Sequence, residues 1–247
     1  MKLIAIDSSG LVASVAITED DNLIAEYNVQ YKKTHSQTLL PMLDELKKMV
    51  ELDLESVDAI AISKGPGSFT GLRIGSATAK GLSQALNIPI VEIGTLEGMA
   101  CNLYGSNRLI VPMMDARRSQ VYTAIFGYEY ENGKYVLKRY LDECAIDVKE
   151  LTDRVNEISK ENDMEVIFLG DGLPVYENEI DTYVSANYIK APSHMNRQRA
   201  AAFSYLAIEK FNNGEYVKCE DHAPDYLRLS QAERERNEGI RNKGSNY

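Results

Sequence analysis

The sequence predicts an α/β protein made of two similar halves, and two observations support this prediction. Short β-branched strands alternate with amphipathic helices, a pattern that favours parallel strand pairing. Each half begins with three short strands, the first ending in an aspartate, and later carries a Gly-x-Gly turn. Asp115 lies 108 residues after Asp7, and Gly170 lies 105 residues after Gly65. These nearly equal offsets indicate an internal duplication; chance alignment of two α/β segments is the alternative.

Length and composition limit the kind of protein this can be. The 247 residues are 44% hydrophobic and 26% charged, which is the balance of a folded globular chain and excludes a disordered one. The 37 acidic and 27 basic side chains give a formal net charge of −10. A field of this sign repels phosphate, so the composition argues against a protein that binds nucleic acid on its own.

The first half begins with a predicted antiparallel meander. Its three strands are separated by Ser-Ser-Gly and Glu-Asp-Asp, and we expect them at 2–7, 11–18 and 22–29. Apolar residues at helical spacing then predict a helix over 36–51, with an apolar stripe made of Leu39, Leu43, Leu46 and Val50. The half is completed by expected strands at 57–63 and 88–93 and expected helices at 70–86 and 95–104.

The second half repeats the same plan. Three strands with an Asn-Gly turn, one helix and one further strand are expected at 108–114, 119–128, 134–141, 147–160 and 165–169. A last apolar helix over 199–211 is predicted to pack back on the first half. We therefore expect a first domain at 1–105, joined by the helix at 197–212, and a smaller second domain at 106–195. The polar tail at 230–247 is expected to fray.

Cysteine usage and the N-terminus indicate the compartment. Cys101, Cys144 and Cys219 are far apart and lack the spacing of a metal site, so we interpret them as buried, reduced thiols. The first residues lead directly into a strand without a long apolar segment, and no stretch approaches the roughly 18 apolar residues of a membrane span. These features predict a cytoplasmic protein with no membrane contact.

The glycine-rich segment GPGSFTG at 65–71 lies between a strand and a helix. Free N–H groups at such a junction can hold a phosphate, which makes Gly65 and Gly67 candidates for an anion site. The segment lacks the Lys and the third Gly of the specific phosphate-binding motifs. The other interpretation, which we favour, is a turn that requires positive φ and close backbone approach.

Small residues recur every four positions along the following helix, at Gly67, Gly71, Gly75 and Ala79. Because Gly costs about 1 kcal/mol relative to Ala inside a helix, the pattern predicts that another element approaches closely. That element is either part of the same chain or a second chain that builds a helical bundle.

Few residues are arranged for catalysis. His35, His194 and His222 lack the spacing of helix-borne metal ligands. Asp7 and Asp115 each end a strand and could hold Mg²⁺ through water, although Asp115 could equally pair with Arg117 or Arg118. No catalytic triad can be assembled. A group of tyrosines on the second predicted hairpin is typical of cross-strand pairs, with base stacking as the less favoured alternative; it comprises Tyr122, Tyr128, Tyr130, Tyr135 and Tyr140.

Five segments together resemble one family. They are IAIDSS near the N-terminus, His35-Ser36-Gln37 with the Leu-Leu-Pro that follows, SKGPGSFTGLRIGSATAKGL at 63–82, MDARRSQVY at 114–122 and PDYLR at 224–228. The chain resembles the TsaB (YeaZ) family, components of the bacterial machinery that makes N6-threonylcarbamoyladenosine on tRNA. The resemblance implies the actin-like ATPase (sugar kinase and heat-shock) superfamily fold, with two duplicated ribonuclease-H-like domains around a cleft.

For activity the resemblance implies a non-catalytic subunit without a cofactor. The paralogous catalytic subunit TsaD binds its metal through His-x-x-x-His, whereas this chain has His35 followed by Leu39. Loss of one imidazole removes a ligand that nothing nearby replaces. Aspartates and glycines at the cleft would then be a vestigial nucleotide site, at Asp7, Gly65, Gly67, Asp115, Gly170 and Gly172.

The resemblance also implies partners. TsaB-like chains pair with TsaD through the two helices of the first domain, TsaE joins as a nucleotide-hydrolysing component, and tRNA is held by the assembly. Here the partner-binding residues would be His35, Leu39, Leu43, Leu46, Val50, Gly71, Gly75 and Ala79. Without its partner the chain is expected to form a homodimer through the same surface. The alternatives are an independent actin-like ATPase or kinase, a glycoprotease-like metallopeptidase and an RNA-binding module.

Overall fold

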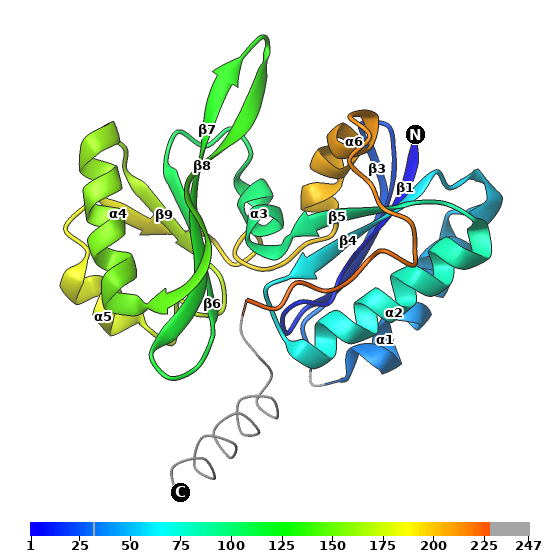
Figure 1. Ribbon diagram of the computed structural model, residues 1–247, viewed down its shortest axis with the longest axis horizontal. Helices are drawn as coiled ribbons and strands as arrows, with labels where there is room; N and C mark the ends of the chain where they lie inside the picture. Colours follow the sequence, from blue (N-terminus) through cyan, green and yellow to red (C-terminus); the bar gives the residue numbers. More distant parts are fainter. Residues whose placement is uncertain (32, 228–247) are drawn as a thin grey trace, which may run out of the picture.

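The first of two five-stranded sheets contains the N-terminal strands. The computed structural model describes residues 1–31 and 33–227 (Figure 1). The strand order is β3-β2-β1-β4-β5, with β1 antiparallel to β2 and parallel to β4. The strand bounds are β1 (Lys2–Asp7), β2 (Ala13–Glu19), β3 (Asn22–Val29), β4 (Ala59–Gly65) and β5 (Ile90–Gly94).

The second sheet has the same topology. Its order from one edge is β8-β7-β6-β9-β10, which corresponds strand by strand to β3-β2-β1-β4-β5. The bounds are β6 (Leu109–Asp115), β7 (Gln120–Glu131), β8 (Lys134–Asp147), β9 (Val166–Leu169) and β10 (Tyr188–Lys190). The repeated order confirms the predicted α/β fold with two duplicated halves, as expected for the actin-like superfamily.

Helices cover both sheets. The pair α1 (His35–Met49) and α2 (Phe69–Leu86) covers one face of the first sheet, and α6 (Ser204–Asn212) packs on the opposite face. In the second half, α4 (Val148–Asn162) and α5 (Glu177–Tyr183) pack on the outer face of the sheet. The short helix α3 (Thr95–Ala100) lies between the halves and buries Leu96 and Met99 against the second sheet.

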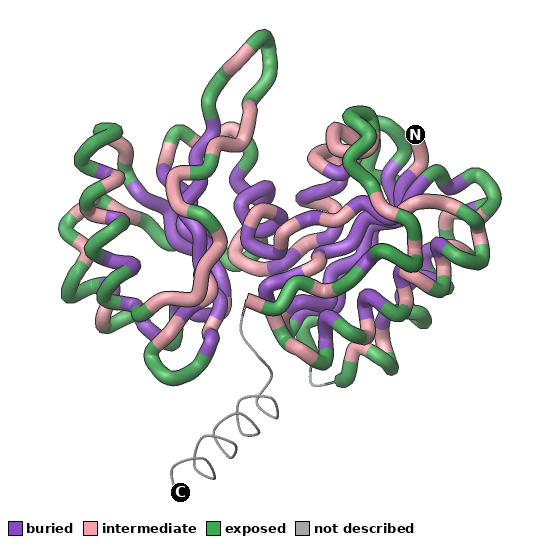
Figure 2. The backbone as a smooth tube through the Cα atoms, in the orientation of Figure 1, coloured by how far each residue is buried: buried purple, intermediate pink, exposed green. Residues whose placement is uncertain are grey.

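We refer to the first sheet with α1, α2 and α6 as the first lobe, and to the second sheet with α4 and α5 as the second lobe. Figure 2 shows that the inner strands of both sheets are largely buried, while the tip of the β7–β8 hairpin is exposed. The strands β3, β8 and β10 at the sheet edges contain only half-buried and exposed residues. The boundary expected after residue 105 falls between α3 and β6. Among the described residues, no helix combines the length and apolar character needed to cross a membrane.

Some elements differ from the predictions. The helix expected at 95–104 is α3 followed by a single 3-10 turn at Cys101–Leu103. The β7 and β8 strands extend to Glu131 and Asp147, beyond the limits that alternation suggested. Neither α5 nor β10 was predicted, because a helix of 7 residues and a strand of 3 residues are too short to show a period.

A segment that sequence patterns left undefined, residues 213–227, crosses the first lobe after α6, and we refer to it as the strap (Figure 1). Val217 exchanges two backbone hydrogen bonds of 2.9 Å with Ile90 on the edge strand β5. Further along, Asp225 N–H donates to the Lys64 carbonyl oxygen at 2.7 Å. The strap therefore covers the edge of the sheet and leads the chain to the gap between the lobes. The tail expected at 230–247 lies outside the described residues.

Candidate functional site

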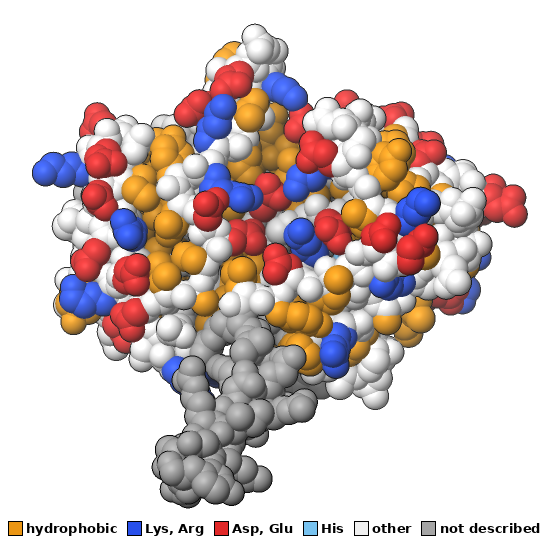
Figure 3. Space-filling view, in the orientation of Figure 1, with side chains coloured by type: hydrophobic (Ala, Val, Ile, Leu, Met, Phe, Trp, Pro, Cys, Tyr) orange, Lys and Arg blue, Asp and Glu red, His pale blue; other side chains and the backbone are white. Residues whose placement is uncertain are grey.

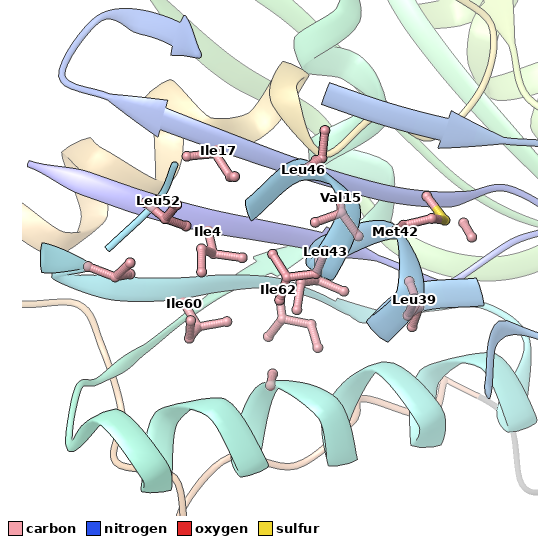
Figure 4. Packing of buried hydrophobic residues seen from close by; sticks show 14 of the residues in the cluster. Ile4, Val15, Ile17, Leu39, Met42, Leu43, Leu46, Leu52, Ile60 and Ile62 are labelled. Carbon is pink, nitrogen blue, oxygen red and sulfur yellow. The ribbon is translucent and has the colours of Figure 1, made fainter. Parts of the chain in front are cut away.

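The predicted apolar stripe of α1 is the inner face of the helix. Leu39, Leu43 and Leu46 are buried and pack with Ile4 and Ile62 in the core of the first lobe (Figure 4). Val50 caps the helix and is half-buried against the same core. This burial corrects the choice of Leu39, Leu43 and Leu46 for the partner surface, because a partner cannot contact these three side chains while the lobe is folded. Val50, which is only half-buried, stays a predicted partner contact.

The small residues of α2 also face inward. A Cβ atom at Gly71 would overlap the Ser8 carbonyl oxygen, and one at Gly75 would overlap the Ser8 hydroxyl. Ala79 is fully buried in the same core. The close approach that the pattern predicted is therefore made by the β1–β2 loop of the same chain. The prediction that Gly71, Gly75 and Ala79 contact a partner is wrong, because these residues face the interior of the lobe.

The opposite sides of α1 and α2 are exposed and contain features that packing within the chain does not explain. On α1, Leu40 is 54% exposed and Met49 is 74% exposed. On α2, Ala77, Gly81 and Ala85 are exposed, and a Cβ atom at Gly81 would meet nothing within 4 Å. Leu40 and Met49 flank the buried side of α1 on its two edges, because nine residues turn the helix by about 900°. We refer to the exposed surface of α1 and α2 that contains these five residues as the outer helical face. Gly81 lowers helix stability by about 1 kcal/mol relative to Ala without any close contact inside the chain to account for it.

A cleft of about 770 Å³ lies between the lobes. Its walls come from the β1–β2 loop, the start of α1, the GPG turn with the start of α2, and the β6–β7 turn. Leu11, Tyr31 and Val175 are exposed at its edge. Of the predicted vestigial nucleotide site, Gly67 and Asp115 line this cleft. The other four predicted residues are not part of its lining; they are Asp7, Gly65, Gly170 and Gly172.

The two predicted aspartates are engaged in local contacts. Asp7 is buried, and its Oδ1 accepts the N–H of Ser9 at 2.9 Å and the Ser9 hydroxyl at 2.7 Å. Burial raises the pKa of Asp7, while the bonds from Ser9 act in the opposite direction. Asp115 accepts the Tyr176 hydroxyl at 3.0 Å and pairs with Arg117 at 3.1 Å. The local ion pair is thus the alternative that the structure selects for Asp115.

The glycines of the proposed vestigial site are required by backbone packing. Added Cβ atoms at Gly65, Gly67 and Gly170 would overlap the carbonyl oxygens of Asp225, Ser9 and Met113, respectively. At Gly172 the Met113 carbonyl oxygen would be 3.1 Å away. Gly65 and Gly170 also have φ of +131° and +111°. The favoured interpretation, a turn with close backbone approach, accounts for these residues, and the chain's own backbone occupies the space beside them.

Two of the three histidines make structural contacts, and the third, His194, is exposed. His35 Nε2 lies 2.9 Å from the Gly10 carbonyl oxygen and joins the start of α1 to the β1–β2 loop. His222 belongs to the strap and is buried, with Nδ1 2.7 Å from Glu92 Oε1. This hydrogen bond is the main cause of the lowered pKa of Glu92. In the part of the chain that the structure describes, no three His, Cys, Asp or Glu side chains are placed to share a metal ion.

The tyrosines form a cluster that spans the lobes. Tyr128 and Tyr135 from the hairpin meet Tyr104 at centroid distances of 5.3 and 5.6 Å. The Tyr128 and Tyr205 hydroxyls are 2.8 Å apart, which joins β7 to α6. Cross-strand pairing was predicted for five tyrosines of the hairpin, and the structure pairs Tyr130 with Tyr135, with ring centroids 5.2 Å apart. The contacts with Tyr104 and Tyr205 have no local sequence signal.

The cysteines are free in the structure. Cys101 is buried, and burial raises its pKa to about 12, so its thiol stays protonated and unreactive. Cys144 and Cys219 are only half-buried. The prediction of burial therefore holds for one of the three thiols.

Together, the duplicated sheets and the cleft between them define a two-lobed α/β protein whose cleft loops pack against one another. The family model described as TsaD: tRNA N6-adenosine threonylcarbamoyltransferase matches residues 23–236. The chain is 34% identical to the tRNA threonylcarbamoyladenosine biosynthesis protein TsaB of Bacillus subtilis (strain 168), over 94% of this chain and 96% of the relative. It is 27% identical to the Escherichia coli (strain K12) TsaB, with the same coverage.

Solved structures agree with these relatives. YeaZ from Pseudomonas aeruginosa superposes with a TM-score of 0.73 at 25% identity, covering 92% of this chain and 100% of that chain. The chain therefore belongs to the threonylcarbamoyltransferase family in the broad sense of the matched model, and within it to the TsaB (YeaZ) family.

Proposed function

We propose that this chain is a non-catalytic cytoplasmic subunit that works with TsaD and TsaE in the synthesis of N6-threonylcarbamoyladenosine. In this proposal TsaD transfers the threonylcarbamoyl group from its adenylate to the adenosine 3′ of the anticodon, in tRNAs that read codons starting with A. This chain docks on TsaD through the outer helical face and supplies no reacting group. TsaE joins as the nucleotide-hydrolysing component.

The residues around His35 support a role without catalysis. Leu39, one helical turn later, is buried in the core and offers no metal ligand. The His35 ring is held by the Gly10 carbonyl oxygen. Cleft glycines that could have surrounded a phosphate are instead packed against carbonyl oxygens of the chain itself. In our proposal the partner supplies the chemistry.

The single observation that carries the docking proposal is the open space around Gly81. On the inner side of α2, Gly71 and Gly75 are needed because the β1–β2 loop packs against them. On the outer side, a Cβ atom at Gly81 would point into open space. A glycine on an exposed helix allows another helix to approach closely. The neighbouring Ala77 and Ala85 keep the same surface flat. In the absence of TsaD, a second copy of this chain is proposed to cover the face as a homodimer.

The charge of the chain supports an indirect role toward tRNA. With a formal net charge of −10, the chain repels the phosphate backbone. In our proposal the complete assembly holds the tRNA.

The test is the substitution Gly81→Leu in the full chain, followed by size-exclusion chromatography with TsaD. A larger side chain at this exposed helical site favours the helix, so the thermal midpoint should stay the same or rise. Co-elution with TsaD should be lost because the leucine blocks close approach. Lys160→Leu, which adds a leucine to the exposed side of α4, is the matched control and should co-elute normally. Normal co-elution of a folded Gly81→Leu variant would contradict the docking proposal.

A further inference from the structure

A second pocket, of about 580 Å³, lies between the lobes on the side where the strap passes. Its lining residues come from β4, β5, α3, α6, the strap and β8. Figure 3 shows acidic and basic side chains gathered close together between the lobes, below the β7–β8 hairpin. None of the functions proposed above uses this pocket.

Two side chains of β8, Arg139 and Glu143, reach from the second lobe to the β5–α3 junction in this pocket. Of the two, Glu143 contacts the backbone of the junction. Its Oε1 accepts the backbone N–H of Glu97, at the start of α3, with a distance of 3.3 Å. The same oxygen would overlap a Cβ atom at Gly94, the last residue of β5. The carboxyl group therefore fits closely against the backbone of the β5–α3 junction, and a Cβ atom at Gly94 would force it to shift.

Charged groups face Glu143 from every element around it. The Glu97 carboxylate of α3 and Asp225 of the strap repel a negative charge on Glu143, whereas Arg139 on its own strand attracts one. Arg139 is shared, because it also lies 3.5 Å from Glu97. The other charged residues that line the pocket are Lys64, Glu92, Asp142, Lys210 and Glu215. Of these, Lys210 pairs with Glu97 at 2.9 Å and Lys64 with Glu92 at 3.4 Å.

The surroundings therefore disfavour one more negative charge. Apart from Glu143, the described lining contains five carboxylates and three cationic side chains, and each of the three cations already lies within 4.0 Å of another carboxylate. An ionised Glu143 would accept the Glu97 N–H more strongly, but it would lose hydration and face two neighbouring carboxylates. The loss of hydration and the repulsion outweigh the stronger hydrogen bond, because burial has the largest influence on the pKa of Glu143.

We propose that the contact between Glu143 and the β5–α3 junction is a proton-operated latch between the lobes. The protonated carboxyl holds β8 against the start of α3, and the ionised carboxylate loosens this contact. Burial raises the pKa of Glu143 to about 7, so the latch responds near neutral pH. Because both lobes form the walls of the cleft, loosening this contact also changes the spacing of those walls.

The test is a pH titration of the full chain by NMR, with amide hydrogen exchange in β8. The Glu97 amide signal of the wild type should titrate with a midpoint near 7. After correction for intrinsic exchange rates, exchange over residues 139–147 should rise about tenfold between pH 6 and 8.5. Glu143→Gln keeps the shape of the protonated group and should show neither change.

Asp142→Asn is the matched control. Asp142 lines the same pocket, but its side chain is 90% exposed, so the variant should titrate like the wild type. The latch is ruled out if the Glu97 amide of the wild type does not titrate near pH 7, or if folded Glu143→Gln loosens as much as the wild type. Should Glu143→Gln fail to fold, the ¹³C signal of the Glu143 carboxyl in the wild type decides, because a midpoint below 5.5 would also contradict the latch.

Discussion

The helices of the two lobes occupy equivalent positions after duplication but have different outer surfaces. The second-lobe helix α4 is the counterpart of α1, and its exposed side is charged, with pairs between Lys149 and Asp153 and between Arg154 and Glu157. The first-lobe helix α2 has 18 residues where its counterpart α5 has 7. Its exposed side contains Ala77, Gly81 and Ala85. Both α1 and α4 carry ion pairs on their exposed sides, since Asp44 also pairs with Lys48 on α1. The lobes therefore differ at α2, which presents a long, flat surface suited to a partner where the second lobe has only the short α5.

The largest change in stability should come from a substitution on the buried side of α1, compared with one on its exposed side. Leu43 is 6% exposed and packs in the core, so Leu43→Ala should lower the free energy of unfolding by about 2–5 kcal/mol. Leu40→Ala, on the outer side of the same helix, should change it by no more than about 0.5 kcal/mol. Urea denaturation of both variants measures the difference. Equal losses would mean that the two sides are not distinct.

The two kinds of glycine in α2 give the next largest effect. Gly75→Ala places a methyl group against the Ser8 hydroxyl and should cost about 1–3 kcal/mol of unfolding free energy. Gly81→Ala places a methyl group in open space and should stabilise the chain by up to about 1 kcal/mol. Thermal denaturation by circular dichroism checks the opposite signs. A destabilised Gly81→Ala variant would show that this site is packed within the chain.

Stability should depend on pH through the contact between the lobes. The pKa of Glu143 is raised from 4.5 to about 7 in the folded chain, so the folded state binds more protons than the unfolded state between these values. The contribution of Glu143 therefore falls as the pH rises from 4.5 to 7 and stays low above 7. The shift in pKa limits the total change in unfolding free energy to about 3 kcal/mol. Because Glu143 is only half-buried, screening by solvent reduces this change to about 1–2 kcal/mol.

The difference in unfolding free energy between Glu143→Gln and the wild type, measured from pH 5 to 8.5, isolates this contribution. The variant should gain stability relative to the wild type as the pH rises. A difference that stays constant over this range would contradict the expected dependence.

The smallest effect belongs to the ion pair at the cleft. Arg117 is 86% exposed, so its pairing with Asp115 is screened by water. Arg117→Ala should change the free energy of unfolding by less than about 1 kcal/mol in urea denaturation. A larger loss would show that the β6–β7 turn depends on this pair.

Sequence patterns predicted the fold because they record local geometry. The strand meanders, the two long helices and the duplication offsets all follow from short-range periodicity. The same periodicity identified Leu39, Leu43 and Leu46 as an apolar face but not what covers it, because a core and an interface select the same side chains. Burial in the folded lobe resolves this ambiguity, which is why the predicted partner residues required correction.

Contacts between distant residues could not be predicted. Glu143 and Glu97 are 46 residues apart, and Tyr128 and Tyr205 are 77 apart. Neither pair has a spacing that a helix or hairpin would impose. The open space around Gly81 was also hidden, since glycines on both sides of α2 look alike until the β1–β2 loop is placed against Gly71 and Gly75.

The central claim is that the outer helical face, and not the cleft, is where this chain meets TsaD. Hydrogen exchange by mass spectrometry, comparing the full chain alone with the chain bound to TsaD, tests it most directly. To separate TsaD contacts from those of a homodimer, the free chain is measured at a concentration where light scattering shows a monomer. We predict slower exchange in α1 and α2, over 35–49 and 69–86, and unchanged exchange in α4. Protection confined to the second lobe, or none in α1 and α2, would contradict the claim.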